Sequence, residues 1–520
     1  MTSAGLPGGG SPGADGPAFD YVVCGGGTAG AVVAARLSQD AGVTVGLLEW
    51  GPSDQDEPKA LYVRRWADML EGEYDLDYRS VPQPRGNSHI RQARARILGG
   101  CSSHNTMIAL RPPPSDFDDW AARGASGWDS ASMEPWFRRL AINIVPVAPQ
   151  HRNAYLAEVI QAASAALRIP VREDWNAEPY ADGTGFLPIG YYPGTGIRSS
   201  SSVAYLHPIL RTRLNLELLA RTRVLRVDFD GARRATGVTA RRDDGSLLHV
   251  AARREVIVCC GAIDTPRLLL LSGIGPADRL RSLGMTVVAD LPGVGANLTD
   301  HVEGIVLWEA ARPLPPEGAT DWDMTIMYRS DRQAAVPDVL AHVPLMTFAM
   351  HPERLGYQTP EHSISMTPNV TRPRSRGVVY LASPDPDDPP LIDYRMFTDS
   401  DGYDETTLLA GMRMARRVAA QQPMAGWILR EVFPGQDVQG DEELSASARA
   451  TCHTVYHVSC TARMGAPGDP DAVLDNRLRV RGVRGLRVID ASAFPSLTTV
   501  NPMVAVLMLA ERGAELVRTS

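Results

Sequence analysis

The sequence predicts an α/β protein of two or three domains. At 520 residues the chain is long for a single hydrophobic core. Hydrophobic residues make up 44% and charged residues 22%, which is ordinary for a soluble globular protein. Near the N-terminus, an apolar strand leads through a glycine-rich turn into a helical pattern and then into a second apolar strand. This order of elements is typical of a parallel sheet that is covered by helices.

The glycine-rich turn predicts a Rossmann-like dinucleotide site. A strand over 20–24 runs into the turn, and a helical pattern follows over 31–37. The turn consists of Gly25, Gly26, Gly27, Thr28, Ala29 and Gly30. Gly25 permits the tight turn, Gly27 lets the backbone approach a pyrophosphate, and Gly30 allows the helix to pack closely on the strand. The motif alone does not separate NAD from FAD, and a purely structural glycine turn is the alternative.

The second strand of this unit predicts a contact with the adenosine ribose. It covers residues 43–48 and ends in Glu49. An acidic side chain at this place accepts hydrogen bonds from ribose hydroxyls in dinucleotide-binding folds. We therefore expect Glu49 to lie beside the cofactor.

Composition excludes several functions. The formal net charge of -8 argues against a nucleic-acid or anionic-membrane binder, and no apolar run approaches the length of a membrane span. Lys59 is the only lysine, so Schiff-base chemistry and Walker-type phosphate binding are not expected. The six cysteines have no zinc-site or disulfide spacing, and no metal is predicted. No secretory signal is visible, which predicts a cytoplasmic protein, and residues 1–17 predict a disordered tail.

Four further motifs, in order along the chain, carry a resemblance to a known family. They cover residues 94–105, 261–276, 291–298 and 488–502, and include the run from Gly99 to Asn105. With these motifs the chain resembles the glucose–methanol–choline oxidoreductases, and within them most closely the choline oxidases. The resemblance implies an FAD-binding Rossmann-like domain over 18–160, 205–302 and 455–520. It also implies an antiparallel-sheet substrate domain over 161–204 and 303–454.

The resemblance also implies which residues hold the cofactor. Beyond the first turn, those residues are Gly99, Gly100, Ser103, His104, Asn105, Val224, Asp490, Asn501 and Pro502. His104 stands where choline oxidases attach the flavin covalently through a histidine ring nitrogen. The implied cofactor is therefore FAD, with His104 as the expected tether.

Alcohol oxidation removes a proton from oxygen and a hydride from carbon, so a base is needed beside the flavin. His457 and Asn501 match the catalytic pair of the family, and histidine suits the base because its pKa lies near neutral pH. The resemblance places His342 against the alkoxide. Thr106 stands where choline oxidases have a serine close to the flavin.

The resemblance extends to a cage for a cation. Glu303 coincides with the carboxylate that faces the substrate's ammonium group, and Trp66 and Tyr456 coincide with two aromatic walls. Gap-free counting puts Asp323 at the place of another tryptophan, with Trp322 one residue earlier. Either the register slips by one residue, or Asp323 replaces an aromatic wall.

Further differences from the choline oxidases follow the two catalytic residues. They are Val458, Ser459 and Cys460 after His457, and Met503 after Pro502. We expect these residues to lie beside the flavin or the substrate, and they leave the identity of the substrate open.

The expected function is oxidation of a primary alcohol, choline or another cationic amino alcohol, to the aldehyde and onward to the acid. Oxygen is the expected electron acceptor, and a homodimer is an open option. A different alcohol, a dehydrogenase with another acceptor, and an FAD-containing hydroxynitrile lyase are the alternatives. A flavin-binding protein without catalysis is disfavoured by the retention of both His457 and Asn501.

Overall fold

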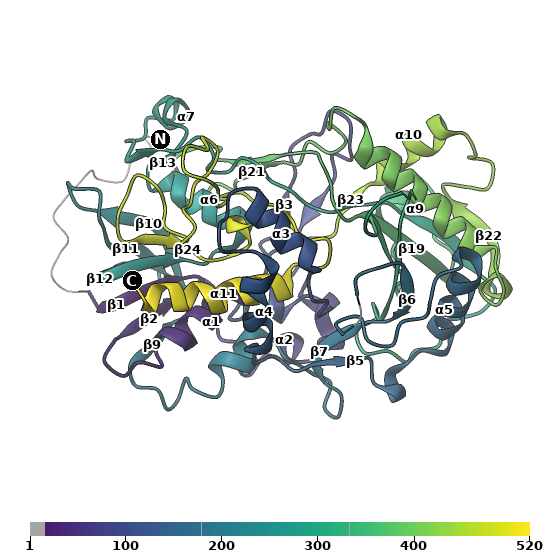
Figure 1. The fold of residues 1–520 in the computed structure, drawn as a ribbon, viewed down its shortest axis with the longest axis horizontal. Coiled ribbons are helices and arrows are strands. Elements are labelled where there is room, and N and C mark those ends of the chain that lie inside the picture. Colours follow the sequence, from purple (N-terminus) through teal and green to yellow (C-terminus); the bar gives the residue numbers. More distant parts are fainter. Residues whose placement is uncertain (1–15, 178, 332) are drawn as a thin grey trace.

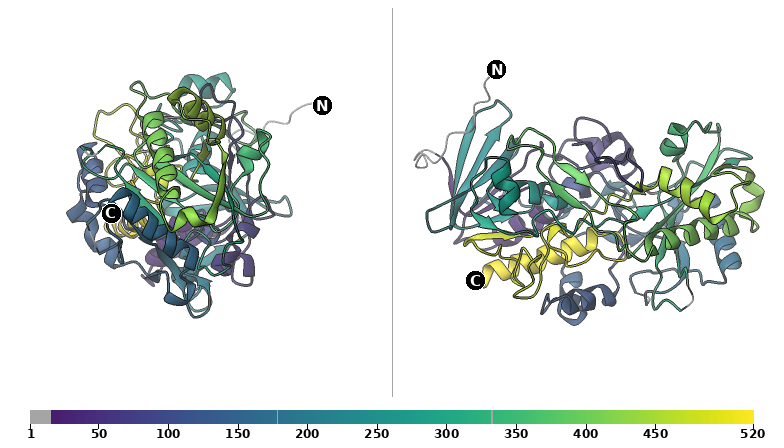
Figure 2. Two further views of the ribbon diagram at one scale, coloured as in Figure 1. Left: turned by 90° about the vertical axis from the view of Figure 1, so that its right-hand side faces the viewer. Right: turned by 90° about the horizontal axis from the view of Figure 1, so that it is seen from above.

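A computed structural model describes residues 16–177, 179–331 and 333–520 (Figure 1). All but the last two residues of the tail expected over 1–17 lie outside this description. Two large sheets lie toward opposite ends of the long axis in Figure 1. The molecule is elongated along that axis and nearly round when viewed along it (Figure 2).

The first sheet joins segments from the N-terminal, middle and C-terminal parts of the chain. Its order is β10-β11-β12-β1-β2-β9, and β24 also pairs with β12. The strands are β1 (Ala18–Cys24), β2 (Val45–Leu48), β9 (Leu216–Leu219), β10 (Thr222–Phe229), β11 (Ala235–Arg242), β12 (Leu247–Val258) and β24 (Leu486–Val488). β9, β2, β1, β12 and β24 pair in parallel, whereas β10, β11 and β12 form an antiparallel meander. The parallel centre explains the continuous apolar runs of β1 and β2, which are covered on both faces.

Helices cover this sheet as the first motif predicts. α1 (Thr28–Leu37) follows β1 and packs beside α11 (Met503–Arg518), while α6 (Gly261–Leu271) packs against β10. The predicted first strand, helix and second strand are confirmed. α1 begins three residues before its predicted start, because Thr28 and the two residues after it already continue the helix from Gly27.

The second sheet is antiparallel, as expected for the second half of the molecule. Its order is β22-β16-β19-β18-β17-β6, and β15 joins β19 to β23. The strands are β6 (Gly183–Phe186), β15 (Val302–Glu303), β16 (Val306–Ala310), β17 (Met324–Tyr328), β18 (Val339–His342), β19 (Ser363–Val370), β22 (Ile428–Phe433) and β23 (His453–Thr454). α5 (Ala154–Leu167) and α9 (Tyr403–Ala419) pack against it, and α10 (Asp441–Thr451) packs against α9.

One expected domain boundary falls inside a helix. The division at residue 160 would cut α5, but Tyr155, Leu156, Val159 and Ile160 are buried together in the core of the second half. The helix therefore belongs to the second half as a whole.

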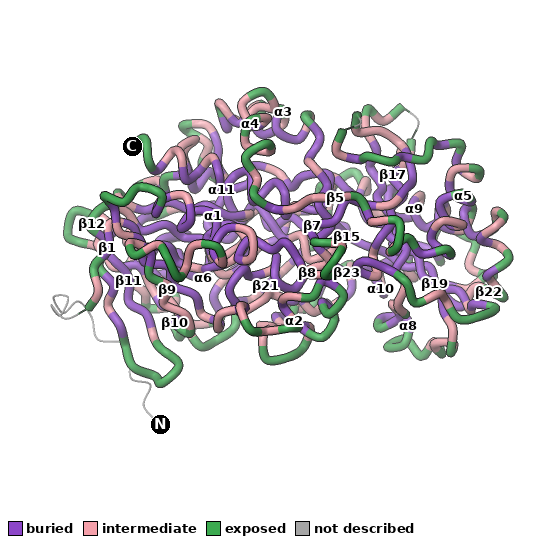
Figure 3. Tube along the Cα trace, turned by 90° about the horizontal axis from the view of Figure 1, so that it is seen from below, coloured by how far each residue is buried: buried purple, intermediate pink, exposed green. Residues whose placement is uncertain are grey.

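Shorter elements fill the space around and between the sheets. They are α2 (Pro58–Leu61), η1 (Val63–Met69), β3 (Tyr78–Arg79), β4 (Arg91–Gln92), η2 (Gly100–Ser103), α3 (Pro114–Ala122), α4 (Ser130–Arg138), β5 (Ile144–Pro146), η3 (Pro149–His151), β7 (Pro188–Tyr192), β8 (Ile197–Arg198), η4 (Ser202–Leu206), β13 (Ile274–Gly275), α7 (Ala277–Ser282), β14 (Ala289–Asp290), α8 (Met350–Arg354), β20 (Val378–Tyr380), β21 (Leu391–Asp393), η5 (Met424–Trp427) and η6 (Ala491–Ala493). Figure 3 shows buried chain running continuously through both halves, with exposed segments at the periphery. The two halves thus form one packed body.

Candidate active site

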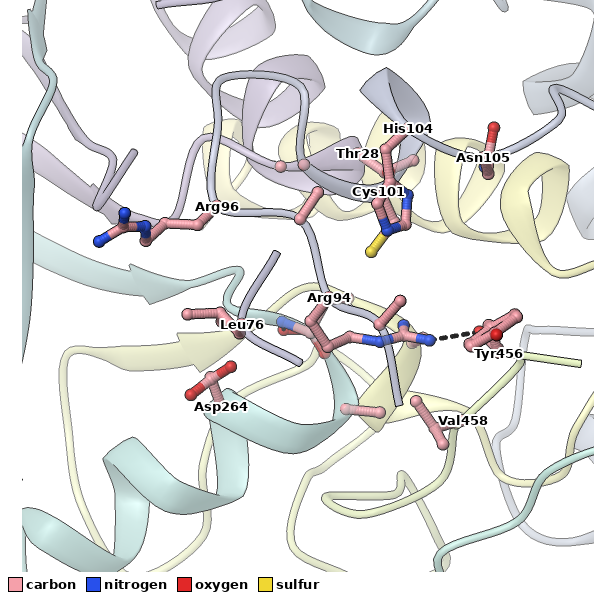
Figure 4. Close-up of a pocket in the computed structure, with 18 of the residues that line it drawn as sticks. Thr28, Leu76, Arg94, Arg96, Cys101, His104, Asn105, Asp264, Tyr456 and Val458 are labelled. Carbon is pink, nitrogen blue, oxygen red and sulfur yellow. Dashed lines mark hydrogen bonds between the residues drawn. The ribbon is translucent and has the colours of Figure 1, made fainter. Parts of the chain in front are cut away.

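A cavity of about 370 Å³ lies between the two sheets. Its walls include Gly25 and Glu49, at the ends of β1 and β2, and Glu303 and His342, on β15 and β18. Figure 4 shows Thr28, His104 and Asn105 among the side chains that line it. The predicted site residues that line the cavity are Gly25, Gly27, Thr28, Ala29, Glu49, Trp66, Gly100, His104, Asn105, Thr106, Val224, Glu303, His342, Tyr456, His457, Asp490, Asn501 and Pro502. Gly30, Gly99, Ser103 and Asp323 do not line it.

The first glycine turn has the geometry that a pyrophosphate requires. Gly25 has a φ of 96°, and a Cβ on Gly30 would lie 1.8 Å from the carbonyl oxygen of Gly25. Gly30 therefore lets α1 pack against the turn, although it does not line the cavity. Gly27 and Gly100 approach each other so closely that a Cβ on Gly100 would lie 2.7 Å from the Cα of Gly27. Two bare backbone segments thus meet at the start of α1, where the helix dipole favours an anion.

Glu49 is held at the edge of the cavity by the backbone. Its carboxylate accepts hydrogen bonds from the amides of Gly26, at 2.8 Å, and Gly51, at 2.7 Å. Burial raises the pKa of Glu49 to about 7, while these two amides act in the opposite direction. Each carboxylate oxygen has further lone pairs, so Glu49 can still accept a bond from a ribose hydroxyl.

The loop before His104 presents an imidazole with no partner. Gly99 has a φ of 85°, and Ser103 donates to the carbonyl of Leu98 at 2.8 Å. Both residues therefore stabilise the conformation of the loop. Both ring nitrogens of His104 are buried and have no hydrogen-bond partner within the described residues. Burial, reinforced by Arg94 and Arg198, lowers the pKa of His104 to about 3, so the ring is neutral.

Asp490 joins the C-terminal segment to the first sheet. Its carboxylate accepts bonds from the amides of Gly261, at 2.9 Å, and Ser492, at 2.8 Å, and from the hydroxyl of Thr265, at 2.5 Å. These bonds fix the loop that precedes Asn501 against the start of α6.

A chain of hydrogen bonds fixes the tautomer of His457. The Nε2 of His301 lies 3.0 Å from the carbonyl oxygen of Thr498, so this nitrogen carries a hydrogen. Nδ1 of His301 is then an acceptor, and Nδ1 of His457, at 2.8 Å, donates to it. Nε2 of His457 therefore carries the lone pair of the ring, which accepts a bond from the amide of Asn501 at 3.3 Å.

This chain prepares His457 to act as a base. Burial, together with His301, His342 and Arg94, lowers the pKa of His457 well below its usual value. The ring is therefore neutral, with its basic nitrogen beside Asn501. The Oδ1 of Asn501 and both ring nitrogens of His342 are buried without partners in the part of the chain that is described. The cavity thus collects one oriented base and several polar atoms that can bind an alcohol oxygen.

Two parts of the chain match models of a known protein family. Residues 19–303 match the model of the N-terminal part of the GMC oxidoreductases. Residues 373–510 match the model of their C-terminal part.

The chain belongs to the GMC oxidoreductase family.

Choline oxidase of Arthrobacter globiformis is 44% identical to this chain, over 96% of this chain and 94% of its own length. Mitochondrial choline dehydrogenase of Homo sapiens is 34% identical, over 96% of this chain and 90% of its own length. Among solved structures, pyridoxine 4-oxidase from Mesorbium loti superposes with a TM-score of 0.88 at 28% identity, and the match covers 96% of this chain and 99% of that one. The predicted family and fold class are confirmed, and the chain is an alcohol-oxidising flavoenzyme of the GMC type.

The residues present fit the flavin cofactor of the GMC fold. The two glycine segments leave room for a pyrophosphate, Glu49 lies at the ribose end, and His104 presents a free imidazole on the same cavity wall. Arg94 crosses this wall toward Tyr456 and donates to its carbonyl oxygen at 2.6 Å (Figure 4). The same cavity is therefore lined at one part by the glycine turn and at another by His457.

Trp322, rather than Asp323, lines the cavity where the third aromatic wall is expected. The indole of Trp322 lines the cavity, packs edge-on against Trp66 with ring centroids 6.2 Å apart, and contacts His342 at 5.7 Å. Asp323 is buried outside the cavity, where its carboxylate accepts bonds from the amides of Ala319, at 2.6 Å, and Thr320, at 2.9 Å. Asp323 closes the turn before β17. The expectation that Asp323 contacts the substrate is therefore wrong, because its side chain does not line the cavity.

The other departures from the choline-oxidase pattern divide into two groups. Met503 and Val458 line the cavity, and the amide of Asn105 contacts the sulfur of Met503 at 3.7 Å. Ser459 and Cys460 do not line it, and both are buried. Of these residues, therefore, only Met503 and Val458 line the cavity that is expected to hold the ligands.

Sequence reasoning missed His301 as the residue that orients His457. The available signal was its position, because His301 lies two residues before Glu303 and directly ahead of β15. It also missed Met346, Phe348 and Met350, which line the cavity from the segment before and within α8. No periodic pattern identifies them, because they lie in a connection between strands.

Two features of the described residues concern membranes and metals. No helix within them is long and apolar enough to cross a membrane. They also contain no group of three or more histidine, cysteine, aspartate or glutamate side chains that could hold a metal ion.

Proposed function

We propose that this GMC oxidoreductase oxidises a primary alcohol that carries a positive charge, choline or a related amino alcohol, to its aldehyde. The observation that supports this most is that Glu303 and His457 line the same cavity. Glu303 is buried in the cavity wall, where burial disfavours its charge unless a positive partner faces it. Trp66, Trp322 and Tyr456 line the same cavity. A desolvated cation needs an anion and aromatic faces of this kind.

In the proposed oxidation each of these residues has a separate role. FAD, when bound, supplies the acceptor for the hydride that leaves the alcohol carbon. Nε2 of His457 takes the hydroxyl proton, and His301 holds the ring that becomes charged. His342 binds the alcohol oxygen as its negative charge grows, and the Nδ2 of Asn501 can donate to that oxygen once Nε2 of His457 carries the proton. In this proposal the half that contains the first sheet binds the cofactor, and the half that contains the second sheet binds the substrate.

Oxygen is the proposed final acceptor, with hydrogen peroxide as the second product. The hydrate of the aldehyde is itself an alcohol, so a second oxidation at the same site would give the acid. A screen of choline, dimethylaminoethanol, ethanolamine and benzyl alcohol with peroxide detection tests the proposal. Turnover of choline or dimethylaminoethanol supports it, and failure of all the cationic alcohols overturns it. Anaerobic addition of the best alcohol should bleach the flavin, whereas a lyase would leave it oxidised.

Changing His104 to Ala is expected to release the flavin from acid-precipitated protein. The reason is the proposed covalent bond between the flavin and the free, neutral imidazole of His104, which alanine cannot form. Absorbance of the supernatant and of the redissolved pellet measures the two flavin fractions. His151→Ala, at a histidine that does not line the cavity, is the control and should keep its flavin in the pellet. Wild-type flavin that appears in the supernatant would disprove the tether.

The pH profile should differ between cationic and neutral alcohols. Burial raises the pKa of Glu303 to about 8, so in the free enzyme the carboxyl is neutral below that pH and charged above it. We expect kcat/KM for choline to rise with pH and to level off above about 8, because the ammonium of choline does not titrate and Glu303 does. The neutral isostere 3,3-dimethylbutan-1-ol should lack this rise. Steady-state rates between pH 5 and 10 measure both profiles, and identical profiles would contradict the role of Glu303.

A further inference from the structure

A second, much smaller cavity lies directly behind Glu303. It has a volume of about 10 Å³, and its walls include Glu303, Phe348, His351 and His453. Glu303 and Phe348 also line the large cavity, so the two spaces meet at the carboxylate. The catalytic sequence proposed above uses neither His351 nor His453.

His453 presents a lone pair to this space. It is the direct cross-strand neighbour of Glu303 in the pairing of β15 with β23, so the two side chains share one face. Nδ1 of His453 lies 2.5 Å from the carbonyl oxygen of Thr454 and must carry the hydrogen. Burial lowers the pKa of His453 to about 4, so the ring is neutral and its Nε2 is an acceptor.

His351 presents a hydrogen to the same space. Its Nδ1 lies 3.1 Å from the Nδ2 of Asn87. The orientation of Asn87 is fixed, because its Nδ2 also donates to the carbonyl of Cys452 at 3.0 Å and its Oδ1 accepts from the amide of His89 at 2.9 Å. Nδ1 of His351 is therefore an acceptor, and Nε2 of the neutral ring is a donor.

Three side chains around this small cavity thus each have a polar atom without a hydrogen-bond partner within the described residues. The Nε2 of His351, the Nε2 of His453 and the Oε2 of Glu303 are all buried, and within the described residues none has a hydrogen-bond partner. The three side chains are between 2% and 5% exposed, and the two imidazole centroids lie 4.8 Å apart. A buried polar group without a partner is costly, and three in one place point to a ligand that bonds to all of them.

We propose that one water molecule occupies this space and bridges the two histidines to Glu303. Its oxygen accepts from the Nε2–H of His351, and its two hydrogens go to the Nε2 of His453 and the Oε2 of Glu303. A cavity needs roughly 10–15 Å³ for one water with two to four polar partners, and this one satisfies both conditions.

The bridge makes His351 and His453 positioning residues for Glu303, a role that rests on the proposed function. A donor on Oε2 favours the charged carboxylate and fixes its direction, while the rest of the group faces the large cavity. The other ionisable or hydroxyl groups that act on Glu303 are Asp300, Tyr456 and Thr367. Asp300 opposes the charge on Glu303 and Thr367 favours it, so the water adds a further favourable group.

A crystal structure of the flavin-loaded enzyme tests the water directly. We expect ordered density within hydrogen-bond distance of both Nε2 atoms and of the Glu303 carboxylate. A dry space, or a direct bond between the two imidazoles, would overturn the proposal whatever the substrate is.

Binding of tetramethylammonium, an inert cation, tests the positioning role. Its Kd, followed by the flavin absorbance of the holoenzyme, should rise about tenfold in His453→Leu, as expected for one lost bond to a charged group. The variant His453→Gln keeps an acceptor and should stay within about threefold of wild type, and His351→Leu should repeat the loss if His453→Leu does not fold. His249→Leu, on β12, is the matched control. Unchanged cation binding in both leucine variants would overturn the role.

The outcomes separate this inference from the proposed function. If the wild-type enzyme binds no cation and oxidises no cationic alcohol, the proposed function fails and the positioning role fails with it. Density for the bridging water would then still establish the site. If cations bind well and the small cavity is dry, only the water bridge fails.

Discussion

Changing His457 to Ala is expected to slow reduction of the bound flavin by substrate about 100-fold or more, as for the loss of a general base. The hydrogen-bond chain through His301 leaves Nε2 of His457 as the one oriented imidazole lone pair beside Asn501. Alanine removes the proton acceptor and leaves His301 without its donor. Stopped-flow mixing with choline in the absence of oxygen measures the rate of flavin bleaching.

The control for this change is His362→Ala. His362 is partly exposed beside the start of β19 and does not line the cavity, so its loss should leave flavin reduction within about twofold. A loss below tenfold in His457→Ala, with normal flavin content, would mean that another group takes the hydroxyl proton.

Changing Glu303 to Gln should reduce kcat/KM for choline about 100-fold and should affect 3,3-dimethylbutan-1-ol by no more than about threefold. The two side chains have nearly the same shape, so the change removes the charge and keeps the packing. A buried ammonium group then lacks the carboxylate of Glu303 on the wall of a cavity that Trp66, Trp322 and Tyr456 also line. Steady-state rates of the wild type and the variant with both alcohols measure this difference. They are taken above pH 8, where Glu303 of the wild type is charged.

Glu309→Gln provides the matched control for Glu303. Glu309 lies on the neighbouring strand β16 and forms an ion pair with Arg430 at 2.7 Å, away from the cavity. Its loss should leave the ratio of the two substrates unchanged. If Glu303→Gln weakens both alcohols equally, the carboxylate supports the wall and does not select the cation.

The parts of the fold that depend on local chemistry could be predicted from sequence. The φ of 96° at Gly25 and the close contact at Gly30 require glycine, so the turn, α1 and β2 could be located with small errors. The pairing of β24 with β12 depends on contacts between distant segments, and no local pattern specifies it. For the same reason the boundary expected at residue 160 fell within α5.

The candidate site was predictable where a motif was continuous and less so across loops. His104 and Asn105 belong to one unbroken run, whereas Trp322 follows a loop whose length shifts the count by one residue. Asp323 shows why the shift matters, because a carboxylate that caps a turn and one that faces a substrate are indistinguishable in sequence. The tautomer of His457 depends on the carbonyl of Thr498, which any residue could supply.

The pairing of β12 with β24 also has a consequence for biosynthesis. His457, β24 and Asn501 are synthesised about 200 to 240 residues after the end of β12, which takes roughly ten seconds or more at ~20 residues per second. During that interval the apolar edge of β12 and the surface later covered by α11 are exposed. The nascent chain therefore carries a flavin-binding turn before it has the segment that closes the flavin site. Stable capture of the cofactor has to wait until that segment has been synthesised, and the exposed apolar surface is an aggregation hazard until then.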